Sequence, residues 1–163
     1  MIWWGSLAGG LVGTTVLTTS LRLAQEMGLT RMDIPFLLGT AVTGNRSRAV
    51  AIGYALHFFN GLVFSLGYAA VFSAVGHAGI AFGAGLGVVH ALFAGGALVN
   101  VVLPSVHPRM GTPWSDAQET PLLETPGFML TNYGRYTAAL TVAAHVAYGA
   151  IVGWFAAGLA LVP

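Results

Sequence analysis

Long uncharged hydrophobic runs, separated by short polar segments, dominate the pattern of this chain. The longest run extends from Ala49 to Pro104 and contains no Arg, Lys, Asp or Glu; a glycine-rich turn at Ser73–Gly79 divides it. Each half is about 25 residues long, enough to cross a hydrocarbon core of about 30 Å at about 1.5 Å per residue. The run therefore predicts a transmembrane helical hairpin.

The same pattern predicts an all-α fold with four membrane spans. The spans are expected at about 3–23, 49–72, 80–103 and 133–161, with a Pro-rich loop at 104–131. Residues 1–163 are expected to form a single transmembrane domain, a four-transmembrane-helix bundle.

A short helix is predicted between the first two spans, in a segment too polar to cross the membrane. Asp33 is expected to cap its N-terminus, Pro35 fits its first turn, and Gly39 is expected to end it. We predict that this helix lies at the membrane interface or re-enters the membrane.

Composition supports a membrane protein and excludes several other classes. Hydrophobic residues make up 56% of the chain and charged residues 7%, whereas soluble domains carry about 25% charged residues. The chain has no cysteine, which excludes disulfides and thiolate sites, and its net charge of +1 provides no basic surface for nucleic acid. The expected surroundings are the lipid bilayer and other membrane subunits.

Every Arg, Asp and Glu falls near the connections that follow the first and third spans. With four spans these two connections share a side, and the positive-inside rule makes that side cytoplasmic. Both termini are then expected outside. Arg22 with Glu26, and Arg31 with Asp33, are expected to form ion pairs at the helix ends.

Glycines recur at intervals of four residues within the spans, which lets helix backbones approach closely. The predicted packing positions are Gly9, Gly13, Gly83, Gly87, Gly149 and Gly153.

Three histidines lie inside predicted spans at similar depths, so we expect one inward-facing layer of His57, His90 and His145. The leading interpretation is a set of neutral histidines that form hydrogen bonds to Asn60, Tyr148, Thr141 or backbone. The alternatives are a haem b or metal site and a proton or ion path. No carboxylate is expected near this layer, which weakens the metal interpretation.

The Pro-rich loop carries a possible soft metal-ligand pair, His107 and Met110. A single His and a single Met in a loop are expected to be solvated. The length of the loop favours contact with a partner.

Several sequence features together resemble an uncharacterised family of small bacterial four-helix inner-membrane proteins. The residues that carry the resemblance are the segment Met27–Ile34, Leu38-Gly39, His57-Phe58, Gly61, Tyr68, Pro104, His145, Tyr148, Gly149 and Gly153. The resemblance implies a four-helix architecture in a bacterial inner membrane, with no substrate or cofactor. The Pro-rich insertion at 107–128 departs from the shorter connection of that family.

The sequence predicts no catalytic residues, since it contains no hydrolase triad, zinc-protease or nucleotide-binding motif. The leading functional hypothesis is a non-catalytic accessory subunit of a larger bacterial membrane complex, respiratory or photosynthetic. The alternatives are a small haem b or metal-binding membrane carrier, and a small transporter or channel that acts as an oligomer.

Overall fold

The regular elements of the chain are helices, in a computed structural model that describes residues 1–111 and 123–160, without the side chains of 159 and 160. Within these described residues, four helical stretches are long and apolar enough to cross a membrane, which confirms the predicted all-α four-span architecture. They are α1 (Ile2–Glu26), α3 (Arg46–Val75), the continuous stretch of α4 (Ile80–Leu92), η1 (Phe93–Val102) and α5 (Leu103–Val106), and α6 (Thr137–Ala160).

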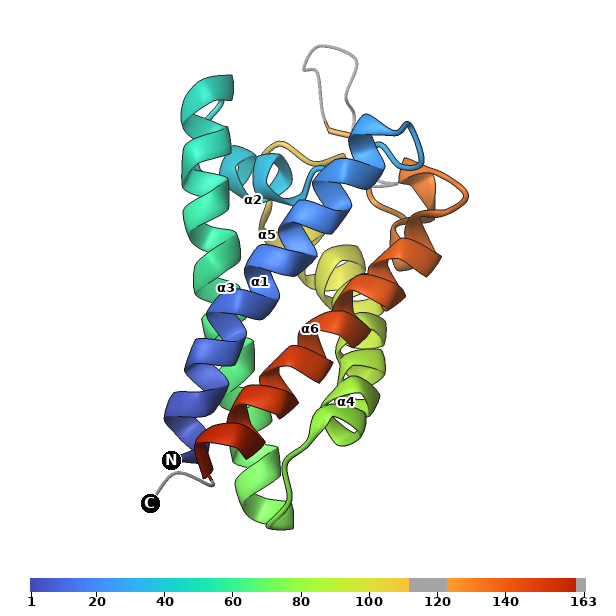
Figure 1. Cartoon of the computed structure of the whole chain (residues 1–163). Coiled ribbons are helices and arrows are strands. Elements are labelled where there is room, and N and C mark those ends of the chain that lie inside the picture. Colours follow the sequence, from blue (N-terminus) through green and yellow to red (C-terminus); the bar gives the residue numbers. More distant parts are fainter. Residues whose placement is uncertain (112–122, 161–163) are drawn as a thin grey trace.

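The four spans pack side by side in the order α3, α1, α6, α4 (Figure 1). Helix α1 packs against α3 on one side and α6 on the other, and α6 packs against α4. The N-terminus, the end of α6 and the turn between α3 and α4 lie at one end of the bundle. The connections that hold the charged side chains lie at the other end, which we call the charged end.

The short helix α2 (Ile34–Val42) lies at the charged end, against the first half of α3 (Figure 1). Its predicted N-cap is confirmed, because a carboxylate oxygen of Asp33 accepts a hydrogen bond from the Phe36 amide at 2.9 Å. The prediction that Gly39 ends this helix is wrong. A Cβ on Gly39 would overlap the Ala49 carbonyl oxygen, so this glycine provides a close crossing of α2 and α3.

The third span is longer than predicted and changes its helical form. It continues to Val106, and residues Phe93–Val102 form a π-helix, η1. Gly95 and Gly96 have low α-helix propensity, and Pro104 has no amide hydrogen to donate to the carbonyl of Asn100. These residues favour the wider π-helix, a form that is frequently found at functional sites.

The fourth span begins at Thr137, later than the predicted Tyr133, because a tightly turned segment precedes it. This segment, η2 (Phe128–Tyr133), contains Met129 and Leu130 with φ angles of 53° and 59°, a conformation that is strained outside glycine. Both side chains are buried and contact Gly95 of η1. The contacts fix η2 against the third span.

The six predicted packing glycines lie at helix–helix contacts. Gly9 and Gly13 of α1 face Val152 and Tyr148 of α6. The contact between α4 and α6 is closer still and uses the other four: Gly83 meets Gly149 and Gly153, and Gly87 meets the carbonyl of His145.

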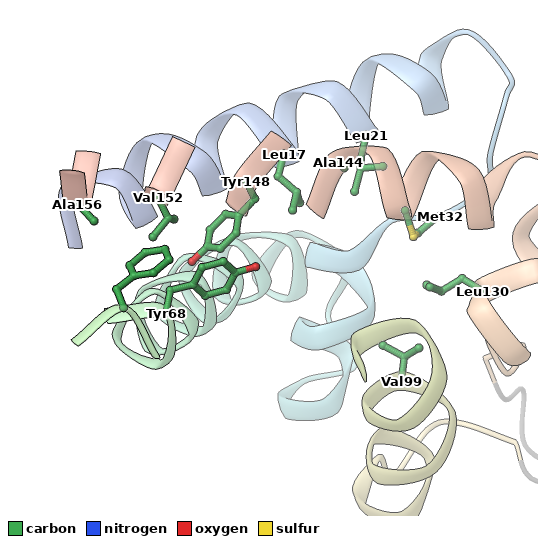
Figure 2. Packing of buried hydrophobic residues seen from close by; sticks show 11 residues of the cluster. Leu17, Leu21, Met32, Tyr68, Val99, Leu130, Ala144, Tyr148, Val152 and Ala156 are labelled. Atoms are coloured by element: carbon green, nitrogen blue, oxygen red, sulfur yellow. The ribbon is translucent and has the colours of Figure 1, made fainter. Parts of the chain in front are cut away.

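The buried hydrophobic cluster follows these contacts along the bundle (Figure 2). Tyr68 of α3 and Tyr148 of α6 meet edge to face, with ring centroids 5.7 Å apart. Val99 of η1 and Leu130 of η2 lie nearer the charged end.

Replacing Gly83 by Ala should destabilise the bundle, because the new methyl would overlap the Gly149 carbonyl oxygen and force α4 away from α6. We expect a loss of about 1–3 kcal/mol, the range for overpacked sites, measured by thermal unfolding in detergent. The matched control is Gly85→Ala on the same helix, where a Cβ meets no atom within 4 Å. Equal stability of the two variants would contradict the close-packing assignment.

Candidate functional site

A cavity of about 260 Å³ lies between the spans and α2. Most of its wall is apolar, and η1 contributes Ala94, Gly95, Leu98, Val99 and Val102. The three predicted histidines and Asn60 all line it. The structure therefore brings His57, His90 and His145 together around one space.

The rings of His90 and His145 touch. Their centroids are 4.7 Å apart with an interplanar angle of 82°. This contact depends on the glycine packing of α4 against α6, since Gly87 lies directly on the His145 backbone. The Phe64 ring, from α3, covers His90 at 4.0 Å between centroids.

One hydrogen bond fixes the tautomer of His145. Its Nδ1 lies 2.8 Å from the carbonyl oxygen of Thr141, and a carbonyl oxygen can only accept, so Nδ1 carries the proton. In an apolar wall the imidazole is neutral, because a lone charge there is costly. The other nitrogen, Nε2, is then an acceptor with a free lone pair.

The remaining polar groups of the cavity make few protein contacts. The Nδ1 of His90 lies 3.5 Å from the Tyr68 hydroxyl, a long and weak contact. Within the described residues, the side chains of His57 and Asn60 form no hydrogen bond, although both line the cavity. Polar groups inside proteins normally have partners, so this part of the wall is suited to a polar ligand atom.

Hydrogen bonds of two further side chains, Tyr148 and Asn100, stabilise the frame of the cavity. The Tyr148 hydroxyl donates to the Gly61 carbonyl oxygen at 2.5 Å and joins α6 to α3. The Asn100 carboxamide lies 3.3 Å from both the Gly127 carbonyl oxygen and the Phe128 amide, so its nitrogen donates to the first and its oxygen accepts from the second. Asn100 therefore holds η2 against η1 and does not face the lipid.

The geometry gives the haem and metal interpretation little support. The described residues contain no group of three or more His, Cys, Asp or Glu side chains placed to hold a metal ion. A metal bonds to imidazole nitrogen at about 2 Å, so two imidazoles that bind one ion from opposite sides cannot have ring centroids as close as the 4.7 Å that separates His90 from His145. The interpretation stays a prediction for His57 with His145.

The fold brings one carboxylate toward the histidine layer, because Asp33 and His57 both line a second, smaller pocket on the side of the charged end. The two residues are far apart in the sequence. They approach each other because α2 folds back along α3, which brings Asp33, the N-cap of α2, toward the middle of α3.

The prediction that His107 and Met110 are solvated is also wrong, since each is only 4% exposed. The His107 Nδ1 accepts from the Arg109 amide at 3.1 Å, so Nε2 carries the proton and donates to the Leu37 carbonyl oxygen at 3.1 Å. His107 thereby ties the described start of the loop to α2. The predicted partner contact of the loop centre, 112–122, lies outside the described residues.

The ion pairs at the charged end follow the prediction only in part. Arg22 and Glu26 pair at 3.0 Å as predicted. Arg31 pairs with Glu124 at 3.1 Å instead of Asp33, whose carboxylate caps α2. The Arg31 amide also donates to the Tyr133 carbonyl oxygen at 2.7 Å, which links the start of α2 to η2.

No family model, curated protein or solved structure matches this chain. The resemblance to an uncharacterised bacterial family therefore stays a prediction. The fold and the site define a class by themselves: an all-α protein with four helices suited to cross a membrane and a histidine-lined apolar cavity between them.

The stability of the charged end should fall at high pH because of Tyr133. Its hydroxyl donates to the Glu124 carbonyl oxygen at 2.9 Å, and burial, with a further contribution from the Glu124 carboxylate, raises the pKa of Tyr133 from 10.0 to about 12. The unfolded chain therefore loses this proton first, so the stabilisation is complete below pH 10 and is lost as the pH rises to about 12.

We expect the advantage of the wild type over Tyr133→Phe in thermal unfolding to shrink between pH 10 and about 12. Tyr136→Phe is the matched control, since it removes the hydroxyl of a neighbouring tyrosine that is 44% exposed. A constant difference between wild type and Tyr133→Phe over this range would contradict the assignment.

Proposed function

We propose that this protein is a non-catalytic membrane protein that binds an apolar molecule with a hydroxyl head in its central cavity. One observation carries the proposal: His57, Asn60 and His145 present polar atoms to a cavity that is otherwise almost entirely apolar. Ligand pockets commonly combine an apolar wall with a few convergent polar groups.

The free Nε2 of His145 supports the choice of a hydroxyl head. This nitrogen can accept a hydrogen bond but, in the neutral tautomer, cannot donate one. The ligand must therefore supply an O–H or N–H. The carboxamide of Asn60 lines the same cavity and can donate to or accept from the same group.

The rim of the cavity supports entry from the lipid. Val102 and Val106, which line it on the third span, are 47% and 70% exposed. A cavity of 260 Å³ has room for a head group and part of a chain, with the rest of the chain outside.

Phytol, an isoprenoid alcohol, should raise the unfolding temperature of the purified protein more than phytane, the hydrocarbon with the same carbon skeleton. Ala94→Phe should abolish this rise, because residue 94 lines the cavity. Ala97→Phe, on the same π-helix but exposed and outside the cavity wall, is the matched control. Equal effects of phytol on both variants would contradict the proposal.

The hydrogen-bond acceptor can be tested separately with His145→Phe, which keeps a ring but removes Nε2. The affinity for phytol should fall about two- to tenfold, since one hydrogen bond contributes about 0.5–1.5 kcal/mol, while binding of phytane should not change. A loss of affinity for phytol that is no larger than the loss for phytane would contradict the assigned role of His145.

An accessory subunit of a larger membrane complex is the second candidate. The same exposed rim supports it, because a helix of a neighbouring subunit could lie over Val102 and Val106. A photo-crosslinker placed at Val106 in intact membranes distinguishes the two candidates. Crosslinks to one defined protein would favour the subunit, and crosslinks to lipid alone would favour the ligand-binding protein.

A further inference from the structure

A small polar pocket adjoins the central cavity, and His57 lines both. It lies between α1, α2 and α3 on the side of the charged end. Its polar lining comprises Thr18, Arg22, Gln25, Asp33, Tyr54 and His57. The pocket measures about 20 Å³, and a buried water needs about 10–15 Å³ with two to four polar partners. The pocket thus has the size and chemistry of a site for one water molecule.

The bonds already made by these side chains show which groups remain for a water. Arg22 is held by Glu26 at 3.0 Å and by Gln25 at 2.9 Å. One carboxylate oxygen of Asp33 accepts from the Phe36 amide. Among the described residues, the other Asp33 oxygen and the ring of His57 have no hydrogen-bond partner, so both remain available.

The geometry points to a single-water site that joins Asp33 to His57 and lets the His57 ring exchange its proton with the aqueous phase at the charged end. Exchange swaps one ring proton for one water proton, so it needs no other reactant. This exchange is separate from the proposed ligand binding and takes place without a ligand. A hydroxyl head bound in the cavity would meet a histidine with access to water on its other side.

The titratable groups around His57 support proton exchange toward the charged end. Arg22, Asp33 and Tyr54 face the small pocket from α1, α2 and α3. On the cavity side, the titratable neighbours are His90 of α4 and His145 and Tyr148 of α6. Since none of these three lines the polar pocket, His57 is the histidine that connects the two spaces.

The inference is tested on the full-length protein in lipid nanodiscs, with ¹⁵N-labelled histidine, by magnetisation transfer from water protons to the ring nitrogens. We expect transfer to His57 to be about tenfold faster than transfer to His90, because only His57 contacts the water. Transfer to His57 that is no faster than transfer to His90 would overturn the inference. This comparison within the wild type needs no variant.

Asp33→Asn removes the charge and keeps the helix cap, because Asn caps helices about as well as Asp. It should slow transfer to His57 about fivefold, since an amide holds a bridging water less strongly than a carboxylate does. Glu124→Gln is the matched control, a carboxylate at the same end that does not line the pocket. Equal transfer rates in the two variants would also overturn the inference. Because neither measurement uses phytol, failure here leaves the ligand-binding proposal testable by itself.

Discussion

The close contact of α4 with α6 is the constraint on which the rest of the structure depends. Glycine faces glycine along this contact, so the two backbones approach more closely than helices with side chains at these positions could. In lipid there is little hydrophobic drive to bring helices together, and such van der Waals packing must supply much of the association. The same approach places the His90 ring against the His145 ring and fixes the polar side of the cavity.

The cavity exists because α3 and α4 do not pack as closely as α4 and α6 do. Aromatic side chains, rather than close backbones, connect α3 to α4: Phe72 meets Phe82 at 5.7 Å, and Phe64 meets His90 at 4.0 Å. Toward the charged end the wall is the π-helix η1, braced by the strained turn at Met129 and Leu130. Native structures retain strained backbone where the surroundings fix it, often beside a functional site.

Much of the fold could be predicted from the sequence, because the length of a hydrophobic run and the spacing of its glycines are properties of a single segment. They predicted the four spans, the Asp33 cap and the inward layer of His57, His90 and His145. The fold-back of α2 and the burial of His107 could not be predicted, because they depend on contacts between segments far apart in the chain. The π-helix was missed for a related reason: Gly95, Gly96 and Pro104 weaken an α-helix without specifying what replaces it.

The central claim is that the cavity holds an apolar molecule whose hydroxyl head lies at His145. The most direct test is an experimental density map of the protein in nanodiscs made from the membranes that produce it. We predict density for one elongated molecule in the cavity, with an oxygen atom about 3 Å from Nε2 of His145. A cavity closed by movement of η1 toward α3, or filled by the helix of another subunit, would contradict the claim.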